Sequence, residues 1–266
     1  MFIDTHAHLY FDDLSDQLES VVNRALEESV KYIICVGTDL ASSKASIAIS
    51  EKFNCVYATV GIHPHDAKDA PSNFLDILEE MILHPKVVGL GEMGLDYFRN
   101  HSSVNQQYKV FHSQLLLAKK LDVPAVIHNR NADEDLLSIV EEISPSKAVI
   151  HCFSSDVAVA KRAIKAGCHL SFTGNITSGN NHTESVLRVI PIEKIMLETD
   201  CPFLAPVPNR GKLNEPSNIP HIAKKIAEIK EIELSDVANL TSTTCLLYTS
   251  DAADEGLGVD LGGRRI

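Results

Sequence analysis

The sequence predicts a single α/β domain that closes into a (β/α)8 barrel of the TIM type. Short apolar runs typical of strands alternate with longer amphipathic segments, eight such units can be counted, and polar residues recur where the strands end. A chain of 266 residues, 44% of them hydrophobic, is long enough to bury one core of this size.

Strands and helices are expected to alternate along the chain. The strands are predicted at residues 2–5, 32–36, 56–60, 87–90, 125–127, 148–150, 169–172 and 195–197. Helical periodicity covers residues 14–29, 42–53, 73–83, 104–121 and 157–166. Most strands are continuously apolar, as expected for parallel strands covered on both faces. Spacing alone also permits an open doubly wound sheet, but the count of eight and the positions of the polar residues favour the barrel.

The C-terminal residues depart from this pattern. Residues 245–266 show neither helical periodicity nor clear strand limits. Their first letters, CLLYTS, resemble the translation of a transposon-end sequencing adapter. We therefore expect a barrel domain over residues 1–244, followed by a non-native or disordered tail over residues 245–266.

Composition restricts the location and the partners of the chain. The formal net charge of -12 argues against a broad duplex-binding surface, which needs many Lys and Arg contacts to phosphates. The sequence shows neither an apolar run of about 18 residues nor a leader pattern, so we expect a cytoplasmic chain without membrane association. Its cysteines, scattered without CxxC spacing, are expected to be buried thiols, and the chain is expected to be a monomer.

Side chains that bind metals recur at the predicted strand ends. His6 and His8 follow the first strand, where residues two apart point to the same side. Glu92 lies between glycines after the fourth strand, and its two oxygens can bridge two cations. Taken alone, the histidine pair is more often structural and Glu92 is as easily a solvated loop residue.

Three further residues repeat this placement. His128 and His151 end consecutive apolar strands, and Asp200 leaves the eighth strand just before a proline. Four imidazoles and two carboxylates converge if the barrel closes. Together they predict a metal site far more strongly than any one of them does alone. Such a set suits two divalent ions, Zn(II), Mn(II) or partly hydrated Mg(II), bridged by Glu92.

Five segments resemble the signatures of TatD-type metal-dependent hydrolases and deoxyribonucleases. They are residues 4–8 (DTHAH), 61–65 (GIHPH), 91–97 (GEMGLDY), 197–202 (LETDCP) and 210–216 (RGKLNEP). The resemblance spans residues 1 to about 244. It implies a metal-dependent deoxyribonuclease fold and activity, with His6, His8, Glu92, His128, His151 and Asp200 as metal ligands.

The hypothesis for function is a DNA phosphodiesterase, expected to be a 3′-to-5′ exonuclease on single-stranded ends. Asp200 would ligate an ion and accept the proton of the attacking water, and Glu92 would act with it. His63 would donate to a substrate phosphate, with Arg210 and Lys212 clamping the backbone beside the scissile bond. A solvated basic loop is the plain alternative for these two cations.

Two other functions remain open from the sequence. An amidohydrolase-type enzyme for esters or amides, such as a D-aminoacyl-tRNA deacylase, would use the same metal pair to polarise a carbonyl. A non-catalytic barrel that binds metal or nucleic acid would keep the ligands but gain nothing from a base at Asp200.

Overall fold

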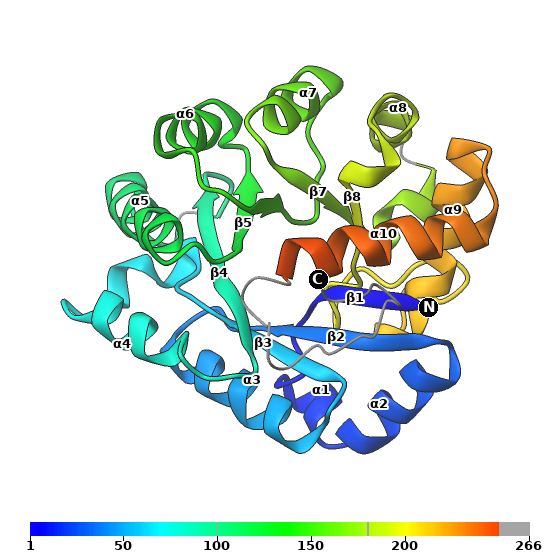
Figure 1. The fold of residues 1–266 in the computed structure, drawn as a ribbon, viewed down its shortest axis with the longest axis horizontal. Coiled ribbons are helices and arrows are strands. Elements are labelled where there is room, and N and C mark those ends of the chain that lie inside the picture. The colour runs from blue at the N-terminus through cyan, green and yellow to red at the C-terminus, as the bar shows by residue number, and fades with distance from the viewer. Residues whose placement is uncertain (100, 180, 250–266) are drawn as a thin grey trace, which may run out of the picture.

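The computed structural model of the chain describes residues 1–99, 101–179 and 181–249. Within them eight parallel strands pair in chain order, and helices surround the sheet (Figure 1). The strands are β1 (Phe2–Ala7), β2 (Val30–Val36), β3 (Val56–Val60), β4 (Val87–Asp96), β5 (Ala125–Arg130), β6 (Ala148–Ile150), β7 (His169–Phe172) and β8 (Ile195–Leu197).

The helices follow the strands in sequence and pack on the outside of the sheet. They are α1 (Asp12–Ser15), α2 (Leu18–Glu27), α3 (Leu40–Lys52), α4 (Phe74–Met81), α5 (Val104–Leu121), α6 (Asp133–Ile143), α7 (Val157–Lys165), α8 (Asn181–Val189), α9 (Ile219–Lys230) and α10 (Leu234–Thr249). Short 3-10 helices lie at η1 (Pro64–Asp69), η2 (Gly174–Ser178), η3 (Ile192–Lys194) and η4 (Pro216–Asn218).

The barrel closes between its first and last strands. Ala7 forms a parallel bridge with Cys201, and the amide of Asp200 donates to the His6 carbonyl at 2.9 Å. The amide of His8 donates to the Cys201 carbonyl at 2.8 Å. These contacts lie at the carboxyl ends of β1 and β8, and the predicted (β/α)8 barrel is confirmed.

Several strands run further than their apolar residues predict. β3, β6, β7 and β8 have the predicted limits, but β1, β4 and β5 continue into the polar residues that follow. In β4 and β5, for example, Gly94 pairs with His128 beyond both predicted strand ends. His6, Glu92 and His128 therefore lie within strands instead of loops, because backbone pairing continues after the apolar run has ended.

Two buried glutamines of α5 hold the loops at the carboxyl end of the barrel. The side chain of Gln114 accepts from the Ile62 amide at 2.8 Å and donates to the Ile62 carbonyl at 2.9 Å. Gln107 pairs in the same way with the backbone of Asp96, at 2.8 and 3.0 Å. Both side chains satisfy backbone groups that would otherwise be buried without partners, which fixes the segments that carry His63 and Asp96.

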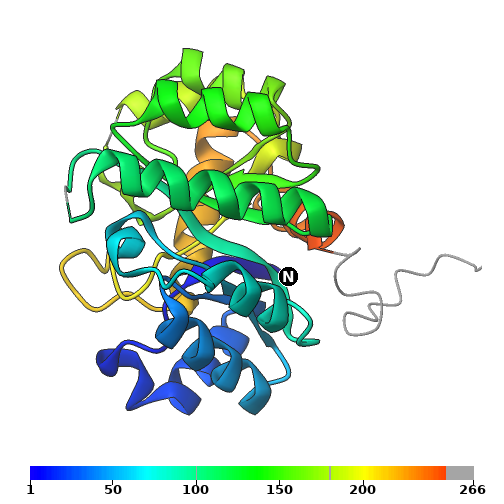
Figure 2. The ribbon, with the colours of Figure 1, turned by 90° about the vertical axis from the view of Figure 1, so that its left-hand side faces the viewer.

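Helix α10 covers the opposite, amino-terminal end of the barrel. The Tyr248 hydroxyl donates to the Ala125 carbonyl at 2.8 Å, and the Ser242 hydroxyl donates to the Met1 carbonyl at 3.0 Å. Figure 2 shows α10 at one end of the molecule and the yellow segment that follows β8 at the other end. The loops after the strands therefore face away from α10.

The end of α10 differs from the sequence-based expectation. No helix was predicted beyond residue 244, but α10 continues to Thr249, with Cys245 and Tyr248 buried. The apolar side chains of residues 245–249 pack against the amino-terminal ends of the strands. A segment this short does not contain enough residues to show helical periodicity. Residues 250–266 lie outside the described residues, and the division into a barrel domain and a non-native tail remains a prediction.

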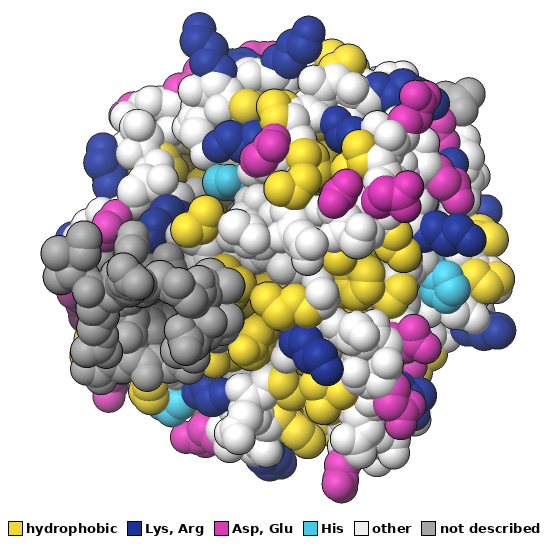
Figure 3. All heavy atoms as spheres, turned by 45° about the vertical axis from the view of Figure 1, so that its right-hand side comes forward, with side chains coloured by type: hydrophobic (Ala, Val, Ile, Leu, Met, Phe, Trp, Pro, Cys, Tyr) yellow, Lys and Arg dark blue, Asp and Glu magenta, His cyan; other side chains and the backbone are white. Residues whose placement is uncertain are grey.

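The surface carries charges of both signs. On the face drawn in Figure 3, acidic and basic side chains are interspersed, and neither sign forms a continuous patch. In the part of the chain that the structure describes, no helix is both long and apolar enough to cross a bilayer.

Candidate metal centre

The structure brings together all six side chains that the sequence singles out as metal ligands. They come from β1, β4 and β5 and from the segments that follow β1, β6 and β8. All except His6 line a cavity of about 380 Å³ at the carboxyl end of the barrel. The six residues are His6, His8, Glu92, His128, His151 and Asp200.

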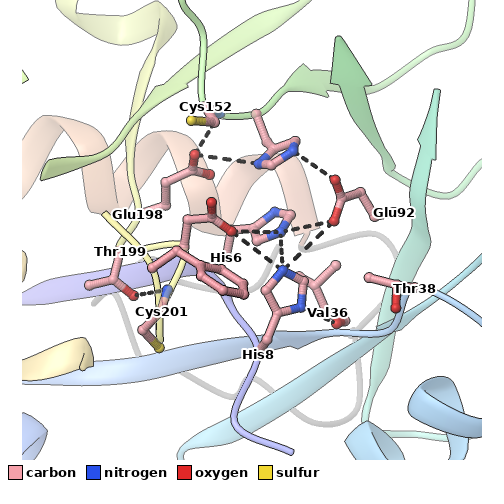
Figure 4. A network of polar contacts seen from close by, with 12 residues as sticks. His6, His8, Val36, Thr38, Glu92, Cys152, Glu198, Thr199 and Cys201 are labelled. Atoms are coloured by element: carbon pink, nitrogen blue, oxygen red, sulfur yellow. Dashed lines mark hydrogen bonds and ion pairs between the residues drawn. The ribbon is translucent and has the colours of Figure 1, made fainter. Parts of the chain in front are cut away.

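Glu92 lies at the centre of the cluster, and each of its two oxygens faces different imidazoles (Figure 4). Its Oε1 lies 2.8 Å from His151 Nε2 and 2.9 Å from His128 Nδ1. Its Oε2 lies 3.3 Å from His6 Nε2 and 3.8 Å from His8 Nε2. A carboxylate placed between two pairs of nitrogen ligands has the arrangement of a bridging ligand.

The hydrogen bonds of His8 show that the cluster suits a cation. His8 Nδ1 lies 2.9 Å from the Val36 carbonyl, which can only accept, so Nδ1 carries a proton. In the neutral ring Nε2 then bears a lone pair, directed at His6 Nε2 (3.2 Å) and Asp200 Oδ1 (3.4 Å). Buried electron pairs this close repel one another unless a cation lies among them, so the donor set fits a metal.

Electrostatics keeps the carboxylates of the cluster ionised. Burial opposes ionisation of Glu92, but the positive charge of His151 and hydrogen bonds from His128 and His151 hold its pKa well below the usual value. Burial also opposes ionisation of Asp200, but a His8 ring that carries a second proton, on Nε2, donates to this carboxylate and lowers its pKa. Two buried anions at neutral pH are the charge complement of divalent cations.

Glu198 lies behind His151 and supports the cluster, a role that was not predicted from the sequence. It is fully buried, accepts from the Cys152 amide and the Ser171 hydroxyl at 2.6 Å each, and lies 3.6 Å from His151 Nδ1 (Figure 4). A carboxylate behind an imidazole orients the ring and raises the basicity of its far nitrogen. The alternation of Glu198 and Asp200 after an apolar strand was the signal for a second functional acid.

His63 joins the cluster as a hydrogen-bond donor. Its Nδ1 accepts from the His65 amide at 3.1 Å, so in the neutral ring the proton sits on Nε2, 3.4 Å from Glu92 Oε1. Burial lowers the pKa of His63 to about 4, which keeps the ring neutral at pH 7. Asp96, another residue without a predicted role, lies 2.8 Å from His65 Nε2 and 3.4 Å from His128 Nε2.

The cations nearest the cluster are not those that the sequence suggested. Arg210 and Lys212 are exposed, and Lys212 Nζ donates to Asn209 at 3.2 Å. Among the described residues, the cavity lining includes Arg99 and Arg130 but neither Arg210 nor Lys212. Arg99 and Arg130 lie after the predicted ends of the fourth and fifth strands, and that position was the only sequence signal for them.

Comparisons with known proteins agree with the fold and identify the family. The family described as "TatD related DNase" matches residues 3–248. The metal-dependent hydrolase YabD of Bacillus subtilis is 40% identical over 245 residues, covering 91% of this chain and 96% of that protein. The "3'-5' ssDNA/RNA exonuclease TatD" of Shigella flexneri is 30% identical, covering 91% and 95%.

A solved structure is similar over nearly the whole chain. The TatD homologue YJJV of Escherichia coli superimposes with a TM-score of 0.89 at 27% identity, covering 94% of this chain and 98% of that one. The family match alone covers far more than half of the sequence. The chain therefore belongs to the TatD family of metal-dependent hydrolases.

Proposed function

We propose that the protein is a two-metal phosphodiesterase that removes nucleotides from the ends of single-stranded DNA. The observation that carries this proposal is the position of Glu92, whose two oxygens face separate pairs of imidazole nitrogens. A centre that held one cation would not need a carboxylate between two nitrogen pairs. The relative named as a single-strand exonuclease supports the choice of substrate.

The six residues of the cluster would hold two divalent ions, with one oxygen of Glu92 available to each. Their mixed nitrogen and oxygen donors fit Zn(II), Mn(II) or partly hydrated Mg(II). Ions bound there supply Lewis-acid polarisation of a phosphoryl oxygen and acidify water. The ionised Asp200, at the cavity wall, would accept the proton of the attacking water.

His63 would orient the substrate without adding charge. Its ring is neutral, and its Nε2–H faces the same cavity as Glu92, so it can donate to a phosphate oxygen. Arg210 and Lys212 would contact the DNA backbone outside the cavity, because their exposed side chains can reach a longer DNA strand.

A digestion of 5′-labelled single-stranded DNA tests the proposal. With Mn(II) or Mg(II) we expect a ladder of products shortened from the 3′ end, abolished by a chelator and restored by metal. Glu92→Gln should lower kcat/KM by roughly a thousandfold, because it removes a charged donor of the centre. The matched control Glu51→Gln, whose side chain is 60% exposed and remote from the cavity, should digest DNA as the unmodified chain does.

Two results would contradict the proposal in different ways. Intact DNA at excess metal, with oligonucleotide binding retained, would indicate a non-catalytic binding barrel. Faster hydrolysis of an ester or amide than of a phosphodiester would indicate an amidohydrolase-type enzyme instead.

A further inference from the structure

Two exposed phenylalanine rings stand at the rim of the metal cavity. Phe11 follows β1 and Phe203 follows β8, and both line the cavity that contains Glu92 and Asp200. Phe11 is 39% exposed and Phe203 is 48% exposed, values that are high for aromatic side chains. Exposed aromatic rings that lie together beside a polar cavity are typical of a ligand-binding surface.

The two rings form one surface, and a third ring supports it. Phe11 and Phe203 meet edge to face, with centroids 5.4 Å apart. On its other side Phe11 stacks on Tyr10 at 5.2 Å, with an interplanar angle of 24°. Tyr10 OH in turn contacts the ligand candidate His8, 3.0 Å from Nδ1. The aromatic surface, defined as Phe11 with Phe203, is thus held in a fixed position relative to the metal cluster.

The wall of the cavity at the ends of β4 and β5, which lie across the barrel from β1 and β8, carries two cations. Arg99 and Arg130 line it, and among the described residues neither guanidinium lies within 4.0 Å of a carboxylate. Arg130 packs 4.1 Å above the ring of Phe98, which restrains its guanidinium beside the cavity. The cavity therefore has an apolar aromatic wall, a cationic wall and a metal cluster between them.

From this arrangement we propose that Phe11 and Phe203 stack against the nucleobase of the nucleotide at the metal cluster, while Arg99 and Arg130 bind its backbone phosphates. A nucleotide has one flat apolar face and one anionic edge, which matches the two walls. An unpaired base can enter the cavity and turn its flat face to the aromatic surface more freely than a paired one, so we expect single-stranded ends to be preferred over duplex ends. This inference rests on the proposed phosphodiesterase function and names the part of the substrate that the site reads.

The experiment compares two single-stranded oligonucleotides that differ only in the terminal residue, which carries either a base or an abasic sugar. The readout is the ratio of kcat/KM for the two substrates. We expect the unmodified chain to prefer the base-bearing end by roughly tenfold, a typical effect of stacking one base on an aromatic ring. Phe203→Ala should bring the ratio close to one, and Phe203→Trp should restore it.

Two control variants separate stacking from other effects. Tyr108→Ala removes another exposed aromatic ring, on α5 and outside the cavity lining, and should leave both rates unchanged. Arg130→Gln should lower both rates together and leave the ratio unchanged, because a phosphate contact does not depend on the base.

The outcomes distinguish this inference from the proposed function. Equal rates for both substrates in the unmodified chain, or a ratio that Phe203→Ala leaves unchanged, would overturn base stacking while the phosphodiesterase assignment stands. Cleavage of neither substrate at saturating Mn(II) would overturn the proposed function and this inference together.

Discussion

Replacing Glu198 by Gln tests whether the buried carboxylate behind His151 tunes the metal centre. The carboxamide can keep the local geometry, because its oxygen can accept from the Cys152 amide and its NH2 group can donate to the Ser171 hydroxyl. What is lost is the negative charge 3.6 Å from His151 Nδ1. The change therefore isolates charge from shape.

The expected effect is a weaker centre in an intact fold. Loss of a carboxylate partner behind a ligating histidine lowers metal affinity roughly 10- to 100-fold, which corresponds to about 1.4 to 2.7 kcal/mol. Competition of Zn(II) or Mn(II) against a chromogenic chelator measures this affinity, and thermal unfolding of the metal-free protein checks the fold. The melting temperature without metal should change by only a few degrees, because the hydrogen bonds are retained.

Ser171→Ala is the matched control for this prediction. It removes one hydrogen bond to Glu198, at a cost of about 1 kcal/mol of stability, but it keeps the charge and should leave metal affinity within about twofold. The reasoning is refuted if Glu198→Gln binds metal as tightly as the unmodified chain, or if Ser171→Ala weakens binding equally.

Three further predictions concern the barrel itself. A Cβ at Gly94 would lie 2.0 Å from a backbone oxygen of β5, so Gly94→Ala should destabilise the protein by about 3 kcal/mol or more. Gly167 is also at positive φ but has open space around it, so Gly167→Ala should cost only about 1 kcal/mol. Urea unfolding of the two variants measures the difference. Burial lowers the pKa of His169 to about 4, so the folded state binds fewer protons than the unfolded chain, and the free energy of unfolding should fall as pH drops from about 6.5 to 4. His169→Gln should flatten that slope, and an unchanged slope would contradict it. A chain that ends at residue 244 should melt at a lower temperature than one that ends at residue 249. The shorter chain loses about 3 kcal/mol of stabilisation from apolar burial at the amino-terminal end of the barrel. Equal melting temperatures would show that residues 245–249 contribute nothing to stability.

The barrel and the convergence of the six candidate ligands were predictable from the sequence for a physical reason. Parallel strands buried on both faces are mostly apolar, so the first and last residues of strands such as β3 and β8 can be found from the apolar run alone. The carboxyl ends of all strands meet at one end of a barrel, so polar residues that follow separate strands meet as well. His6 and Asp200 are 194 positions apart in the sequence, yet a backbone hydrogen bond joins them.

The walls of the cavity were not predictable in the same way. Phe11, Phe203 and Arg99 lie in loops, and no sequence period governs which way a loop side chain faces. Those loops take their shape from distant contacts, such as the hydrogen bonds of Gln114 to Ile62. The exposed Arg210 and Lys212 were plausible phosphate contacts because of their charge alone. Charge in the sequence gives no information about how far a side chain lies from the cluster.

The assignment of a bridging role to Glu92 is the central claim, and anomalous diffraction from crystals grown with Mn(II) tests it most directly. Two anomalous peaks are predicted, each about 2.0 to 2.6 Å from a different oxygen of Glu92. A single peak, or peaks that leave either Glu92 oxygen without a cation, would contradict the account.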